Sequence, residues 1–141
     1  MGRVISVERV GTKRQQLRRT VAEALRRLME KPELDEEAKD LAALIVFCLD
    51  AIAEGVDRSA TAWERRNYYL KADRFRREWA WASRTADEMM TLIREDAWDG
   101  LPAVLASLLP HFADVRVVKL VRPPSLWQGA YQRLLAEETP R

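Results

Sequence analysis

The sequence predicts a mainly α-helical fold, a bundle of four to five helices with a short two-stranded β pairing of its N- and C-terminal segments. Apolar residues recur at intervals of three and four through most of the 141 residues. Residues that start or stop helices separate these stretches. One short segment rich in β-branched residues lies towards each end of the chain. The length suits one domain, which we expect to span residues 1–141.

The composition favours a folded protein without membrane contact. Hydrophobic residues make up 48% of the chain and charged residues 33%, which provides enough apolar material for a core. The longest apolar stretch, residues 41–53, is too short to cross a bilayer, and residues 1–6 lack the features of a signal peptide. The single cysteine, Cys48, fits a packing role in a reducing compartment. We therefore expect a cytoplasmic protein.

The first expected elements are a strand and a helix. Residues 3–10 alternate apolar and polar side chains, which is typical of a short, half-buried strand. Thr12 and Gln15 form a capping box, so a helix is expected over about residues 12–31. Pro32 follows this helix and cannot continue it.

Two longer helices are expected next. Asp35 is a suitable N-cap for a helix over about residues 35–54, and Gly55 suits its C-terminal end. Apolar residues cover most of the circumference of this helix, so we expect it to be the central one. The following helix is expected to be the longest and to run over about residues 60–96.

The C-terminal part is expected to hold two shorter helices and a second strand. A helix is predicted over about residues 102–112, with Pro102 in its first turn. Residues 115–121 are rich in valine and predict a strand, and residues 125–138 predict a final helix. The strand could pair with residues 3–10, although an isolated two-stranded ribbon needs helices or another chain to support it.

The formal net charge of +2 conceals blocks of alternating sign. The net charges of successive segments are +6 over residues 1–31, −6 over 32–60, +4 over 61–84, −5 over 85–114 and +3 over 115–141. Such blocks either pair within the fold or face a charged partner. The first block favours binding to nucleic acid, and the near-neutral total weighs against it.

The residue types that known catalytic, metal and nucleotide sites require are not combined in this sequence. The lone histidine, His111, has only Asp114 nearby, whereas zinc sites need three or four protein ligands. The five glycines are scattered singly, so neither a phosphate loop nor a dinucleotide-binding fingerprint is present. Helix-dipole matching explains the acidic cluster at residues 33–40, although it could hold a hard cation. We expect no catalytic residue, metal, cofactor or small-molecule ligand.

Basic side chains crowd the expected start of the first helix. They are Lys13, Arg14, Arg18 and Arg19. The free amide groups of a helix start already carry partial positive charge, so a phosphate group or an acidic partner would relieve the repulsion. This set is a candidate anion-binding or nucleic-acid-binding site. The alternative is solvation, or pairing within the fold with the acidic residues at 33–40.

One side of the expected third helix combines tryptophan, leucine and arginine. The apolar members are Trp63, Leu70, Trp81 and Leu92, and the basic members are Arg66, Arg74, Arg77 and Arg84. Trp and Arg are enriched in protein interfaces, which makes the apolar members a candidate protein-binding surface. The same residue types stack on bases and bind phosphates in single-stranded nucleic acid. A third interpretation is internal packing, with arginine stems lying over another helix.

These observations predict a non-catalytic helical interaction or scaffold protein that binds itself or another protein through the Trp/Arg side of the third helix. The alternative is an accessory protein that binds RNA or single-stranded DNA through the basic first helix and the same arginine residues. An enzyme with unfamiliar carboxylate or arginine chemistry is a third class, because active sites need not follow known motifs.

Overall fold

The computed structural model describes residues 7–137 of the chain, with side chains from Val10 onward. The elements in chain order are α1 (Val7–Met29), α2 (Glu36–Glu64), α3 (Tyr69–Arg94), η1 (Trp98–Gly100), α4 (Leu101–Leu108), η2 (Leu109–Phe112), η3 (Pro124–Leu126) and α5 (Ala130–Leu135), where η marks a 3-10 helix. The prediction of a mainly helical fold is confirmed. The predicted pairing of two terminal strands is not present in this part of the chain.

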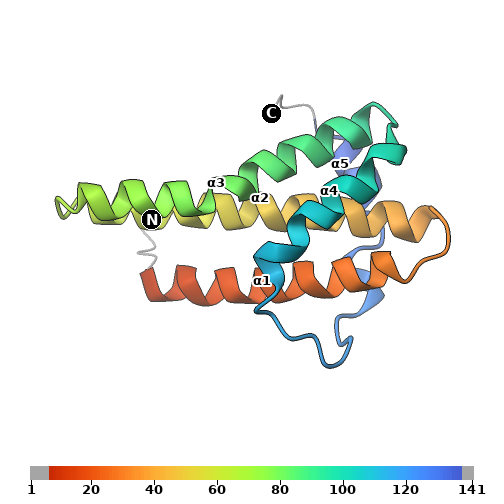
Figure 1. Cartoon of the computed structure of the whole chain (residues 1–141), viewed down its shortest axis with the longest axis horizontal. Coiled ribbons are helices and arrows are strands. Elements are labelled where there is room, and N and C mark those ends of the chain that lie inside the picture. Colours follow the sequence, from red (N-terminus) through yellow and green to blue (C-terminus); the bar gives the residue numbers. More distant parts are fainter. Residues whose placement is uncertain (1–6, 138–141) are drawn as a thin grey trace.

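The three long helices lie side by side in antiparallel order, with α2 in the middle (Figure 1). α2 packs along both α1 and α3. In Figure 1, α4 crosses in front of these helices, and α5 packs against α2. The α1–α2 loop and the α2–α3 turn lie at opposite ends of the long axis of the molecule.

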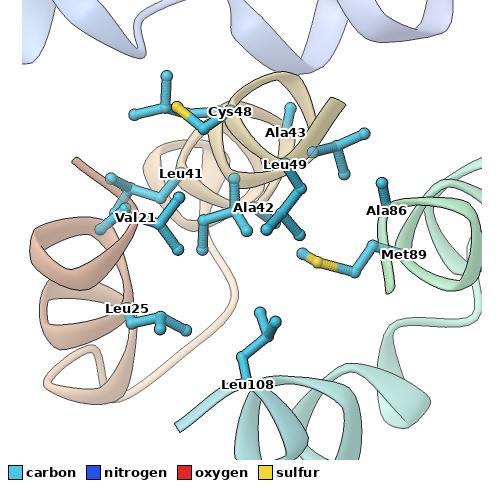
Figure 2. Close-up of a cluster of buried hydrophobic side chains, with 14 of the residues drawn as sticks. Val21, Leu25, Leu41, Ala42, Ala43, Cys48, Leu49, Ala86, Met89 and Leu108 are labelled. Carbon is cyan, nitrogen blue, oxygen red and sulfur yellow. The ribbon is translucent and has the colours of Figure 1, made fainter. Parts of the chain in front are cut away.

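The core surrounds α2 and explains its sequence. Ile45, Leu49 and Ile52 are completely buried, and other buried residues of this helix lie around most of its circumference. Figure 2 shows side chains that converge on the core, including Leu25 from α1 and Leu108 from α4. A helix that is apolar on every side needs cover on every side. The prediction that the second helix is central is confirmed.

Two predictions at the contact between α1 and α2 are wrong for one shared reason. Residues 3–6 of the predicted strand lie outside the described residues, but residues 7–10 belong to α1. Val10 is buried, and a Cβ atom built on Gly55 of α2 would lie 3.2 Å from Val10 Cγ1. Gly55 therefore gives α1 room to approach and does not end α2, which continues to Glu64. Contact between the two helices therefore outweighs the strand preference of residues 7–10 and the tendency of Gly55 to end a helix.

The single long helix predicted over residues 60–96 is instead divided between two antiparallel helices. Residues 60–64 are the end of α2, and α3 begins at Tyr69. Between them Asn67 has φ +66°, a left-handed conformation that asparagine tolerates better than most residues. The chain reverses here, so α3 returns along α2 instead of extending away from it.

The C-terminal part is less regular than predicted. The helix expected at residues 102–112 is α4 followed by η2, because Pro110 has no amide hydrogen to continue α-helical bonding. Residues 115–121 form no strand. The helix expected at residues 125–138 is replaced by η3 and the short α5, with Gly129 at φ +80° between them. This left-handed residue cannot belong to a continuous right-handed helix.

A buried carboxylate fixes the irregular segment at residues 115–121. The Glu23 side chain in α1 accepts hydrogen bonds from the backbone N–H groups of Val121 and Arg122, both at 2.9 Å. These N–H groups therefore need no neighbouring strand. The guanidinium groups of Arg27 and Arg122 each lie 3.6 Å from the same carboxylate. Burial alone would raise the pKa of Glu23, but its hydrogen bonds and these positive charges outweigh burial and hold the pKa below its ordinary value.

Replacement Glu23→Gln should lower the free energy of unfolding by about 2 kcal/mol near neutral pH, because hydrogen bonds to a buried charged group are lost. Since the pKa of Glu23 is lower in the folded chain than in the unfolded chain, its ionised form stabilises the fold above the ordinary carboxyl range. This stabilisation disappears as pH falls through the folded pKa. Urea unfolding from about pH 7 down to about pH 3 should show a larger acid loss in the wild type. Parallel pH profiles would contradict this role for Glu23.

Cys48 is a second residue whose ionisation the fold controls. Burial in α2 raises the pKa of its thiol to about 12. Because the thiolate is the reactive form, the native protein should react with an aromatic disulfide reagent only as fast as the chain opens. Reaction in denaturant should be immediate. Rapid stoichiometric labelling of the native protein, followed by absorbance, would show that the thiol is accessible.

Candidate functional site

The α2–α3 turn projects from one end of the molecule (Figure 1). The backbone N–H groups of Arg66 and Tyr68 both donate to the carbonyl oxygen of Trp63, at 3.0 and 2.9 Å, which closes the end of α2. Along the long axis this turn lies beyond the described start of α1, so that helix does not flank it. We call residues 63–74 the hairpin end.

Three large side chains at the hairpin end are exposed to solvent. Tyr68, Tyr69 and Leu70 have exposed fractions of 54%, 59% and 80%. A single exposed apolar residue is ordinary, whereas several together are typical of a binding surface. The hairpin end therefore has the first property expected of a contact site.

The surface beside these residues is hollowed. The hollow has a volume of about 460 Å³ and is lined by Trp63, Leu70, Lys71, Arg74, Phe75 and Glu78. The rings of Trp63 and Phe75 pack edge to face with centroids 4.9 Å apart. The ammonium group of Lys71 lies 4.5 Å from the centroid of the Trp63 ring. The hollow thus combines an aromatic lining with two cations, Lys71 and Arg74, and one carboxylate, Glu78.

Several cations at the hairpin end are not neutralised within the fold. Arg65, Arg66 and Arg74 make no side-chain hydrogen bond or ion pair with any residue between 10 and 137. Arg65 and Arg66 are exposed in the turn, and Arg74 borders the hollow. These groups are available to an anionic partner.

Two other arginines of α3 are used within the fold. Arg76 connects α3 to α2, with Nη1 2.7 Å from Glu64 Oε2 and Nη2 3.1 Å from Asp57 Oδ1. Its hydrogen bonds with Glu64 are the main reason that the pKa of Arg76 rises. Arg77 forms an ion pair with Asp73 one turn earlier in α3. Arg76 therefore braces the hairpin, and Arg77, a predicted anion-binding residue, has an internal partner.

A continuous row of aromatic rings runs from the hairpin end to η2. Its members in order are Trp63, Phe75, Trp79 and Trp81, followed by His111 and Phe112. The rings of Trp81 and His111 are stacked, with centroids 4.0 Å apart and planes inclined by 10°. Trp81 is 9% exposed, because η2 covers it. The predicted Trp/Arg surface is therefore divided into an open part near Trp63 and a covered part around Trp81.

Two basic residues of α1 attach that helix to the aromatic row. The guanidinium carbon of Arg14 lies 5.1 Å from the centroid of Phe75 and 5.5 Å from that of Trp79. Arg18 is buried and forms a 2.6 Å ion pair with Asp114. Burial, and then repulsion by Arg18, lower the pKa of Arg14. Both arginines therefore have contacts within the fold.

The other two predicted anion-binding residues of α1, Lys13 and Arg19, are exposed. The predicted helix start at Thr12 is wrong, because α1 already includes Val7. The amide groups near Lys13 lie in the body of the helix and are not free. The helix-dipole argument for an anion site at these positions therefore does not apply.

The remaining predicted residues of the Trp/Arg side are separated from the hairpin end. Leu92 is half-buried beside Gly100, where an added Cβ atom would lie 3.0 Å from Leu92 Cδ2. Arg84 is exposed. Burial lowers the pKa of His111, and the positive charge of Arg84 lowers it further. Neither Leu92 nor Arg84 borders the hollow.

The structure brings together a subset of the predicted residues and adds others. Trp63, Leu70 and Arg74 border one hollow, and Arg66 lies in the adjacent turn. The residues of this surface that were not predicted from the sequence are Arg65, Tyr68, Tyr69, Lys71 and Phe75. The sequence feature that could have indicated the turn is Asn67, which lies inside an unusually long predicted helix and tolerates a left-handed backbone conformation.

The part of the chain between residues 7 and 137 has neither a metal-ligand cluster nor a membrane-spanning helix. No three side chains of His, Cys, Asp or Glu there are grouped so that they could hold a metal ion. No helix in the same range is both long enough and apolar enough to cross a bilayer. Comparison with protein-family models, curated proteins and solved structures finds no match to this chain.

Replacement Trp81→Ala should lower the free energy of unfolding by about 3 kcal/mol, because it leaves a cavity beneath η2. Leu70→Ala should change it by less than about 0.5 kcal/mol, since that side chain contributes little to the core. Chemical denaturation followed by circular dichroism measures both effects. A similar loss in the two variants would mean that Leu70 is packed in solution.

Proposed function

We propose that the chain is a non-catalytic interaction protein that self-associates, with the hairpin end as its contact surface. The observation that carries this proposal is the group formed by Tyr68, Tyr69 and Leu70, exposed beside a hollow with an aromatic lining. Covering large apolar side chains that are in contact with water lowers the free energy of the system. A surface of this kind at a projecting end is accessible to another molecule.

The composition and rigidity of the hairpin end suit a protein partner. Tyr, Trp and Arg are the residue types most enriched among side chains that dominate binding energy. The Arg76 bridge to Glu64 and the packing of Trp63 on Phe75 hold this surface in place before binding. A preorganised surface loses less conformational entropy on association.

The distribution of charge supports a second copy as the partner. Antiparallel packing brings Arg65, Arg66 and Lys71 to one end of the long axis. The acidic residues at 33–37 lie at the opposite end, in the α1–α2 loop and the start of α2. Each copy therefore carries positive charge at the hairpin end and negative charge at the opposite end. Attraction between these two ends of different copies guides association.

Replacement Leu70→Glu should raise the dissociation constant for self-association by at least about tenfold, equivalent to about 1.4 kcal/mol. Val118→Glu is the matched control, because Val118 is 77% exposed but lies in the segment between η2 and η3. That control should assemble as the wild type does. Sedimentation equilibrium over a range of concentrations measures all three proteins.

Two results would contradict the proposal: a wild type that remains monomeric at high concentration, or equal weakening by Leu70→Glu and Val118→Glu.

The second candidate function is binding of single-stranded nucleic acid, favoured by the exposed rings of Tyr68 and Tyr69 beside Arg65 and Arg66. A monomeric protein that shifts labelled RNA in a gel, with an affinity that falls steeply with salt, would replace the first proposal by the second.

A further inference from the structure

The end opposite the hairpin end presents a surface with complementary features. Leu34 in the α1–α2 loop is 43% exposed. Its acidic neighbours Glu33 and Glu36 are also exposed and form no side-chain hydrogen bond or ion pair with the described side chains. The loop and the first residue of α2 therefore combine one apolar side chain with two carboxylates that no described cation neutralises.

The α1–α2 loop is held in one conformation by its other charged residues. The ammonium group of Lys31 lies 3.0 Å from Asp35 and 2.8 Å from Glu37. Asp35 also caps α2 by accepting a hydrogen bond from the N–H of Ala38 at 2.8 Å. A loop ordered in this way loses little further entropy when it binds.

We infer that the hairpin end of one copy receives the α1–α2 loop of a second copy, an inference that rests on the proposed function. Leu34 enters the hollow and contacts its aromatic lining. The carboxylates of its two acidic neighbours then face Lys71 and Arg74, which border the same hollow. Apolar contact supplies the affinity, and the opposite charges select the orientation.

The position of the two surfaces dictates a head-to-tail arrangement. They lie at opposite ends of the long axis, so one chain cannot place its own loop in its own hollow (Figure 1). Contact between two different surfaces is a heterologous interface, which repeats from copy to copy unless a ring closes. Assembly therefore either continues beyond a dimer as concentration rises or closes as a ring, of which two antiparallel chains are the smallest.

A second hollow on the molecule gives no comparable argument for an occupant. It has a volume of about 470 Å³ and lies between α1 and residues 109–117. Its charged lining residues, Arg26 and Glu30, pair with each other at 3.3 Å. Neither residue is left to select a charged partner.

The experiment uses two variants of the full chain, each altered at one end. The hairpin variant carries Leu70→Glu with Arg74→Glu, and the loop variant carries Glu33→Gln with Leu34→Ser. All four side chains are exposed, so both variants should retain the circular dichroism spectrum and thermal midpoint of the wild type. Each variant alone should be monomeric where the wild type assembles.

An equimolar mixture of the two variants should form a particle with the mass of two chains and nothing larger. The intact hollow of the loop variant binds the intact loop of the hairpin variant, and both remaining ends are disabled. A chain that carries all four substitutions is the control and should stay monomeric. Light scattering coupled to size exclusion distinguishes these masses.

The outcomes separate this inference from the proposed function. If the loop variant assembles as the wild type does while the hairpin variant is monomeric, the hairpin end is a contact surface but the α1–α2 loop is not its partner. If both variants are monomeric and their mixture forms no dimer, the head-to-tail arrangement is wrong. If the hairpin variant assembles normally, the proposed function itself fails.

Discussion

The burial of α2 from every side is the constraint on which the rest of the structure depends. Because apolar residues occupy most of its circumference, this helix is stable only when α1, α3 and the C-terminal elements cover it. From Thr61 to Glu64 its residues are only half-buried. The neighbouring elements cover α2 only as far as its apolar residues extend. The hairpin end lies beyond that point and is exposed.

Long side chains help to connect the two outer helices across α2. Arg14 and Arg18 reach from α1 to the rings of Phe75 and Trp79 in α3, because arginine stems can lie over apolar surface while the guanidinium group contacts a ring. These arginines are therefore engaged inside the molecule. Arg65, Arg66 and Arg74 at the hairpin end have no such internal partner among the described side chains.

The sequence was informative where one local pattern determines the result. The apolar run from Leu41 to Ile52, interrupted only by Asp50, predicted the central helix correctly. The end of α2 was not predictable from Gly55, because Val10, far away in the sequence, decides whether a glycine ends a helix or admits a neighbour. Likewise, Trp81 belongs to the predicted Trp/Arg side by helical spacing, but η2 covers it. Leu70 remained open because no later segment of the described chain packs over it, whereas Trp63 is half-buried against Phe75.

The close approach of Val10 to Gly55 has a consequence for how the protein tolerates change. α1 is one unbroken helix, so the separation set at this point is transmitted along it to Arg14, which reaches the aromatic rings, and to Glu23, which holds residues 115–121. A methyl group at Gly55 would favour α2 by about 1 kcal/mol through helix propensity. It would also lie 3.2 Å from Val10 Cγ1, so Val10 would have to move by a few tenths of an ångström to admit it. The size of the side chain at residue 55 therefore limits how closely the N-terminal part of α1 can approach α2.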